Sequence, residues 1–82
     1  MTLKMFRVSI LDIKTAEPVF REMASSVVLP GEEGEFSILD FHQPLISCLK
    51  DGMIKIDRES PIHIKRGIAR MEGDELSVLV EK

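Results

Sequence analysis

Hydrophobic and polar residues alternate along most of this chain with a period of two. Near the start, Phe6, Val8 and Ile10 alternate with Arg7 and Ser9. Such alternation is typical of a β-strand that has one face in the core and the other in solvent. No segment keeps the i, i+3, i+4, i+7 spacing of an amphipathic helix beyond one turn. The pattern therefore predicts a protein built from strands.

Turn-forming residues divide the rest of the chain into short strands. We expect Pro30 to end one strand, since proline cannot donate to a ladder. Asp51-Gly52 is expected to form a hairpin turn, and Gly67 to interrupt a strand. A second strand is expected to begin at residues 19–20, and the remaining strands are expected at residues 24–29, 35–38, 45–49, 54–57, 62–64, 68–71 and 76–81. About eight to ten short strands at this spacing predict an all-β fold, a two-sheet β-sandwich with no substantial helix.

Length and composition restrict the class of protein. A chain of 82 residues has room for a single domain, which we expect to span residues 1–82. The net charge of −3, with acids and bases mixed, argues against a nucleic-acid partner. No apolar run approaches the roughly 18 residues of a membrane span, and residues 1–10 lack the core of a signal peptide. We therefore expect a soluble domain without direct membrane insertion.

The residues that carry chemistry are few. One cysteine excludes an internal disulfide, and with two histidines it makes a poor metal set, so no metal or cofactor is expected. Cys48 with His42 or His63 is the only candidate nucleophile and base, but Cys48 lies in an apolar strand and is expected to be buried and inert. Gly31 and Gly34 have the wrong spacing for a phosphate loop, and no lysine follows them. The chain is not expected to be an enzyme.

Two polar loops stand out between residues 27 and 45. The first contains Glu32, Glu33 and Glu35 around two glycines, and the second contains His42. Polar loops lie at the surface, where binding residues gather. The acids are either a solvated turn or a complement to a basic partner, which would steer docking. His42 is either an exposed loop residue without a role or a recognition contact.

The order of these motifs resembles a known family, the epsilon subunit of F-type ATP synthase, called delta in mitochondria. The resemblance rests on residues 26–36 (SVVLPGEEGEF), 42–46 (HQPLI) and 49–56 (LKDGMIKI), together with the opening and closing strands. It covers almost the whole chain. Each motif alone is weak, but the ordered set is fairly specific.

The resemblance implies a non-catalytic rotor subunit at the foot of the central stalk. The implied partners are the gamma subunit and the membrane ring of c subunits, so that the domain links the two and helps couple ion translocation to ATP synthesis. Carried over by position, the c-ring contacts are Glu35 and His42, with Glu33 and Phe41 as additional candidates. The implied location is peripheral, on the cytoplasmic face of a bacterial membrane.

The chain also departs from the family pattern. Asp40-Phe41 replace the usual Pro-Gly before His42, and Lys65-Arg66 replace two residues of a usual Ser-Gly-Gly. Family members usually continue into an inhibitory helical hairpin, which is expected to be missing here, whether in a natural short form or in a piece of a longer protein. The alternative function is a free-standing β-sandwich module that binds a small ligand or a peptide. An open apolar pocket would favour that module, and an exposed apolar patch over a filled interior would favour the stalk subunit.

Overall fold

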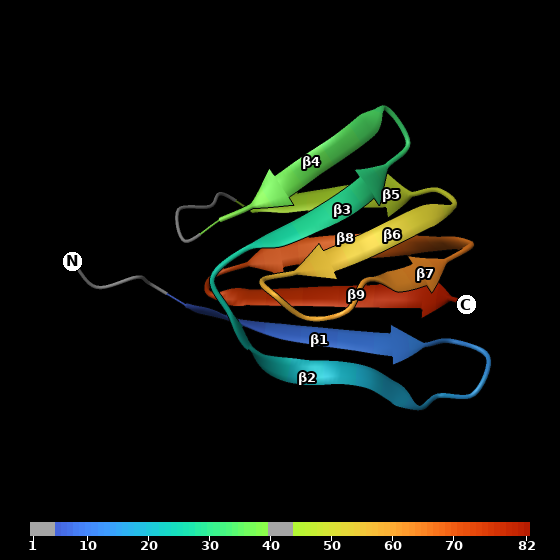
Figure 1. Ribbon diagram of the computed structural model, residues 1–82, viewed down its shortest axis with the longest axis horizontal. Helices are drawn as coiled ribbons and strands as arrows, with labels where there is room; N and C mark the ends of the chain where they lie inside the picture. The colour runs from blue at the N-terminus through green and yellow to red at the C-terminus, as the bar shows by residue number, and fades with distance from the viewer. Residues whose placement is uncertain (1–4, 40–43) are drawn as a thin grey trace.

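The computed structural model describes residues 5–39 and 44–82, and all regular structure within them is β-strand (Figure 1). No helix that is long and apolar enough to cross a membrane occurs in these ranges. The nine strands are β1 (Phe6–Asp12), β2 (Pro18–Ala24), β3 (Val27–Gly31), β4 (Gly34–Ile38), β5 (Leu45–Leu49), β6 (Gly52–Ile56), β7 (Ile62–Ile64), β8 (Arg66–Glu72) and β9 (Glu75–Glu81). The predicted all-β class and strand number are confirmed.

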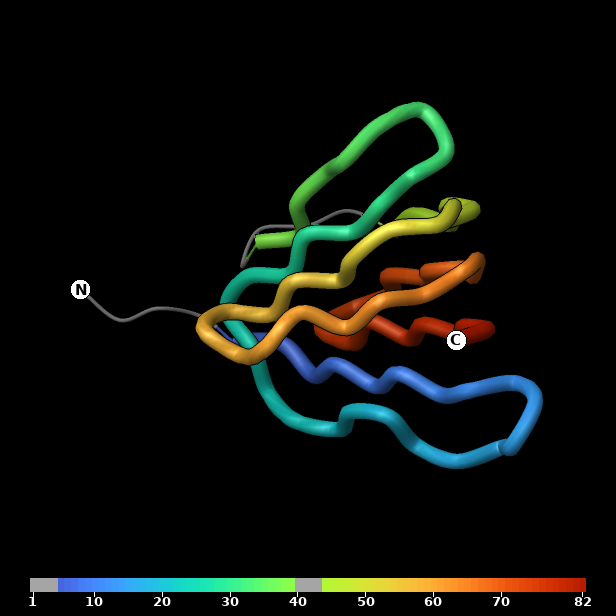
Figure 2. The backbone as a smooth tube through the Cα atoms, turned by 45° about the vertical axis from the view of Figure 1, so that its right-hand side comes forward, coloured from blue at the N-terminus to red at the C-terminus, as the bar shows by residue number. Residues whose placement is uncertain are grey.

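The strands form one sheet that curls over on itself. Their order is β2-β1-β9-β8-β5-β3-β6-β7, with β4 paired to the other edge of β3. Only β1 and β9 pair in parallel among the described ladders. In Figures 1 and 2, the strands β4, β3, β6 and β7 form one layer in front of the layer that contains β5, β8 and β9. The two sheets of the predicted sandwich are therefore continuous with each other.

The two layers join where β3 ends beside β5. The ladder between them contains a single pair, Gly31↔Leu49. The Lys50 N–H donates to the Pro30 carbonyl at 2.9 Å, and the Glu32 N–H donates to the Cys48 carbonyl at 3.1 Å. The prediction that Pro30 ends its strand is wrong, because β3 runs on to Gly31. Proline lacks only the donor, and its carbonyl still accepts a hydrogen bond at this corner.

Two further turn predictions need correction. Asp51-Gly52 does not close a hairpin, because β5 pairs with β8 and β6 pairs with β7. This turn instead carries the chain from one layer to the other. Gly67 lies inside β8 and does not interrupt it. A Cβ atom at Gly67 would lie 2.6 Å from the Leu79 carbonyl oxygen, so close approach of the neighbouring strand explains the glycine.

The interior is filled by hydrophobic side chains from both layers. Among the described residues, no polar or charged residue is buried. The period-two pattern explains this packing, because alternate residues of β1, β8 and β9 point inward. The buried hydrophobic residues are Phe6, Val8, Ile10, Ala24, Val27, Leu29, Ile38, Leu49, Ile54, Ile56, Ile64, Ala69, Met71, Leu76, Val78 and Val80.

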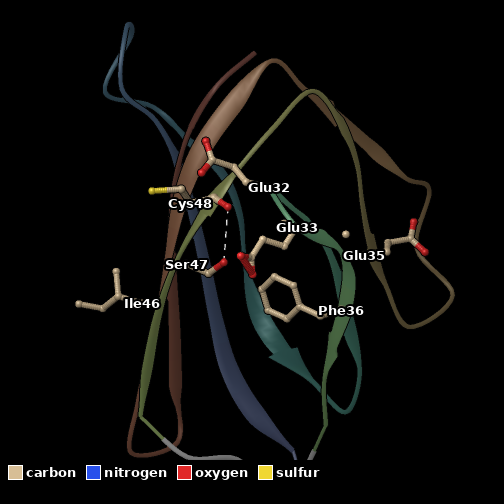
Figure 3. A pocket seen from close by; sticks show the side chains of 9 residues that line it. Glu32, Glu33, Glu35, Phe36, Ile46, Ser47 and Cys48 are labelled. Carbon is tan, nitrogen blue, oxygen red and sulfur yellow. Dashed lines mark hydrogen bonds between the residues drawn. The ribbon is translucent and has the colours of Figure 1, made fainter.

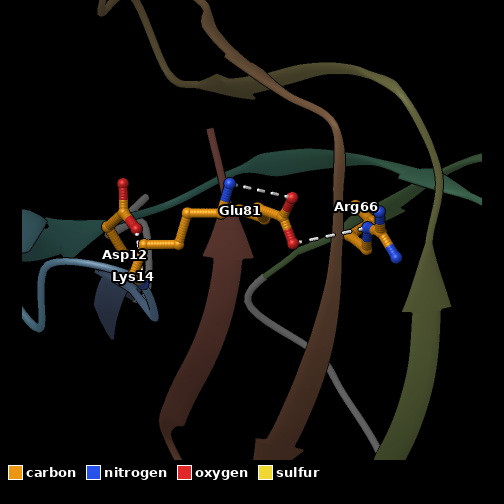
Figure 4. A network of polar contacts seen from close by, with 4 residues as sticks. All are labelled: Asp12, Lys14, Arg66 and Glu81. Carbon is orange, nitrogen blue, oxygen red and sulfur yellow. Dashed lines mark hydrogen bonds and ion pairs between the residues drawn. The ribbon is translucent and has the colours of Figure 1, made fainter.

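Polar contacts hold the ends of the sandwich. The Asp57 carboxylate accepts hydrogen bonds from the Ser25 N–H and from the Ser25 hydroxyl, the latter at 2.9 Å. This contact links the turn after β6 to the crossover between β2 and β3. Near the end of β9, the Glu81 carboxylate lies 3.4 Å from Lys14 Nζ and 3.5 Å from Arg66 Nε (Figure 4). Glu81 therefore connects the end of β9 to the β1–β2 turn and to the start of β8.

Candidate docking surfaces

An acidic groove lies beside the β3–β4 hairpin. Its volume is about 500 Å³, and it is lined by residues 31–36 of the hairpin and residues 46–48 of β5 (Figure 3). Glu32, Glu33 and Glu35 are all among the lining residues, although the Glu35 carboxylate points out of the groove (Figure 3), and the lining contains no lysine, arginine or histidine. The Phe36 ring supplies apolar surface, whereas the Ile46 side chain points away from the hairpin (Figure 3). The groove is therefore suited to a cationic group with apolar neighbours.

Glu35 points away from Glu33 and from β5 (Figure 3). Its carboxylate lies 3.6 Å from Lys55 Nζ on β6, and both side chains are more than half exposed. An exposed pair of this kind contributes little stability. Glu35 therefore remains available to a partner, on the side of β4 that the groove does not occupy.

The structure separates some of the residues that the sequence grouped. Glu33 lies at the turn where the chain enters β4, and Leu39 follows the opposite end of that strand. Phe41 and His42 lie outside the described residues, so their place relative to Glu35 stays a prediction.

An apolar surface covers the outer face of the layer that contains β1, β9, β8 and β5, called the larger layer below. The ladders place Cys48, Ile68, Leu79 and Leu11 side by side on four adjacent strands. Ile68 is 48% exposed and Leu79 is 46% exposed, and nearby Ile13 is 54% exposed. Except for Leu11, these residues line an open cleft of about 310 Å³, to which Glu32 and Arg66 also belong. Exposed apolar residues in such an array are typical of a protein contact.

The predicted burial of Cys48 is wrong. Its neighbour Leu49 points into the core, so Cys48 points outward and is exposed. Residues 45–49 are almost all apolar, and their composition does not reveal which face of the strand is buried. Pairing with β8 decides this, because Cys48 lies opposite Ile68 and not opposite buried Ala69.

The described residues do not assemble a reactive centre. His63 on β7 contacts Asp51 (Nε2 to Oδ1, 2.9 Å), whereas Cys48 lies on β5 beside the acidic groove. No cluster of three or more histidine, cysteine, aspartate or glutamate residues with the geometry of a metal site occurs within residues 5–39 and 44–82.

Comparison with known proteins identifies the family. The ATP synthase delta/epsilon chain β-sandwich domain matches residues 6–82. The chain belongs to this family. The resemblance noted in the sequence is thereby confirmed. An epsilon-type chain is a non-catalytic subunit of the synthase, so the expectation that the chain is not itself an enzyme is also confirmed.

Individual relatives agree with this assignment. An ATP synthase epsilon chain of Rickettsia bellii is 35% identical over 80 residues, which covers 87% of this chain and 74% of the relative. An epsilon chain of Campylobacter curvus is 41% identical over 76 residues, covering 87% of this chain and 59% of the relative. The chain thus spans roughly three fifths to three quarters of the length of these relatives.

Solved structures show the same fold at low sequence identity. The Tetrahymena thermophila mitochondrial ATP synthase central stalk and c-ring structure contains a chain with a TM-score of 0.76 and 14% identity, covering 99% of this chain and 67% of that one. The Euglena gracilis mitochondrial OSCP/F1/c-ring structure contains one with a TM-score of 0.79 and 15% identity, covering 100% of this chain and 53% of that one. At this identity the likeness concerns the fold.

Proposed function

We propose that residues 1–82 form one domain that acts as a rotor component of an F-type ATP synthase. It links the gamma subunit of the central stalk to the c ring and helps couple ion translocation to ATP synthesis. The complex is bacterial, and the domain is peripheral on the cytoplasmic face of the membrane. Family membership over residues 6–82 supports this role. A filled interior also suits a rotor subunit that must transmit torque, since close-packed cores deform little under load.

The observation that carries the proposal is the apolar row on the outer face of the larger layer. Leu11, Cys48, Ile68 and Leu79 lie side by side on four strands. We assign this surface to the gamma contact, because an interface that must hold under torque needs a dry apolar centre. Among the described residues, the exposed Ile68 and Leu79 side chains line an open cleft and not an enclosed pocket, which favours the stalk role over the free-standing module.

The contact to the c ring is proposed at Glu35, Phe41 and His42. Glu35 is exposed, has only the weak Lys55 pair, and points away from the groove. A carboxylate at the edge of an interface speeds the approach of a basic loop more than it strengthens the binding. Glu33 lines the acidic groove. It therefore joins this contact only if the c ring also extends over the groove.

Binding to the gamma subunit of the same synthase tests the proposal. Replacing Ile68 and Leu79 together by serine removes about half of the exposed apolar row without touching the core, since both side chains point outward. We expect the dissociation constant, measured by isothermal titration, to rise by about 100-fold. The matched control replaces Met5 and Met53 by serine, because these residues are similarly exposed (50% and 43%) and lie elsewhere. Equal binding by both double variants would contradict the assignment.

A further inference from the structure

The acidic groove lies between two strands that each have an edge without a partner strand. β5 pairs with β8 along its whole length but meets β3 only at Gly31↔Leu49. β4 pairs with β3 and with no other described strand. Both β4 and β5 contribute side chains to the groove (Figure 3). Unpaired strand edges are templates for an added strand, and proteins usually cover or block them.

The backbone of Ile46 is the open point on the β5 edge. The Cys48 carbonyl faces the hairpin, because it accepts a hydrogen bond from the Glu32 N–H at 3.1 Å. Backbone groups two residues apart in a strand point to the same edge. The Ile46 N–H and carbonyl therefore face the groove as well, beyond the last described pair with β3. Together they present one donor and one acceptor to an incoming strand.

The charges around the β5 edge indicate which kind of segment would bind in the groove. Glu35 is paired with Lys55, but within residues 5–39 and 44–82 neither Glu32 nor Glu33 takes part in an ion pair. Two carboxylates without a cation therefore border a groove that also contains the Phe36 ring. An extended segment with a lysine or arginine next to an apolar residue satisfies both features.

We propose that the groove receives an extended, basic segment of the gamma subunit, which adds as a strand to the free edge of β5. The inference rests on the proposed function, and it places a second gamma contact beside the apolar surface. The two are continuous, since Glu32 and Cys48 line both the groove and the cleft that contains Ile68 and Leu79. Strand addition supplies backbone hydrogen bonds, and the side-chain pockets supply specificity. The c-ring contact at Glu35 lies on the other side of β4.

Two measurements on the complex with gamma test this contact. The first is amide hydrogen exchange at residue 46, which we expect to slow at least about tenfold when gamma binds, because a new strand protects its N–H. The second is the affinity of the double variant Glu32→Gln and Glu33→Gln. We expect its dissociation constant to rise about tenfold at low salt and the difference to shrink at high salt. The matched control is Glu22→Gln with Glu59→Gln, which removes the same charge from exposed positions outside the groove.

The possible outcomes separate this inference from the proposed function. Failure of the unaltered chain to bind gamma would overturn the proposed gamma contact and, with it, the inference. Binding that depends on Ile68 and Leu79, but leaves exchange at residue 46 unchanged and affects both glutamine double variants equally, would overturn the groove contact alone. Slowed exchange together with a selective loss in the Glu32 and Glu33 variant would support it.

Discussion

The two layers of the sandwich share one interior but have different outer faces. The layer that contains β5, β8, β9 and β1 has an exposed apolar row with Ile68 and Leu79 at its centre. The layer of β4, β3, β6 and β7 exposes mainly polar side chains, including Glu35, Lys55 and His63. Both layers follow the same alternating pattern inside. The inward residues therefore build the shared core, while the outward residues give the two layers different surfaces, of which we assign the apolar one to the gamma contact.

The largest expected effect tests whether the two layers form one core. Ile10 of the larger layer and Ile56 of the smaller layer are both buried (0% and 2% exposed). Replacing either by alanine should lower the free energy of unfolding by about 2–5 kcal/mol, because each change leaves a cavity. Urea denaturation should give one transition with an unchanged slope for both variants. Two separate transitions in either variant would show that the layers unfold independently.

A smaller effect is expected from loss of the hydrogen bonds between Ser25 and Asp57, which link the turn after β6 to the crossover between β2 and β3. Asp57→Ala removes the acceptor for the Ser25 N–H and hydroxyl and places alanine at a φ of +43°. The free energy of unfolding should fall by about 1–3 kcal/mol from the lost hydrogen bonds and the added backbone strain. Thermal unfolding monitored by circular dichroism measures this loss. The control is Asp57→Asn, which keeps one side-chain oxygen and should lower the free energy of unfolding by less. An equal loss in both variants would show that the charge of Asp57 is what stabilises the contact.

The smallest effect is expected on the polar outer face. Lys55→Met removes the 3.6 Å contact with Glu35 between two exposed side chains. The free energy of unfolding should change by less than about 1 kcal/mol, and Glu35 should become more available to a basic partner. Chemical denaturation measures the stability, and binding of isolated c rings measures the availability. A large loss of stability would show that this pair holds β6 to β4, and would argue against Glu35 as a free docking residue.

Much of the fold was accessible from the pattern of residues. Alternation predicted the buried faces of β1 and β9, where each inward position is apolar and each intervening position is more polar or more exposed. The acidic turn and its glycines were also correctly placed at the β3–β4 hairpin. The predictions failed where the local sequence is ambiguous. Pro30 and Asp51-Gly52 look like ordinary strand ends, yet both lie at the corner that joins the layers.

The candidate surfaces were less accessible. Cys48 was expected in the core because β5 is apolar on both sides, and only its pairing with Ile68 shows that it faces outward. Glu33 and Glu35 are two residues apart, and this spacing suggests that they form one set. The structure instead places Glu33 at the turn and Glu35 on the far side of β4 from the groove. The residues that flank a side chain across a sheet come from distant parts of the sequence. The residues next to it in the chain therefore do not reveal them.

Alternation and the ordered motifs are properties of local sequence, so the residues alone are enough to assign an all-β domain of the delta/epsilon family. Which strands become neighbours is visible only in the folded chain. The register of β1, β9, β8 and β5 created the apolar row, and the single β3–β5 pair left the β5 edge open beside the acidic hairpin. The reason is physical: a strand's side chains have two faces by geometry, but each face acquires its neighbours only when distant strands pair.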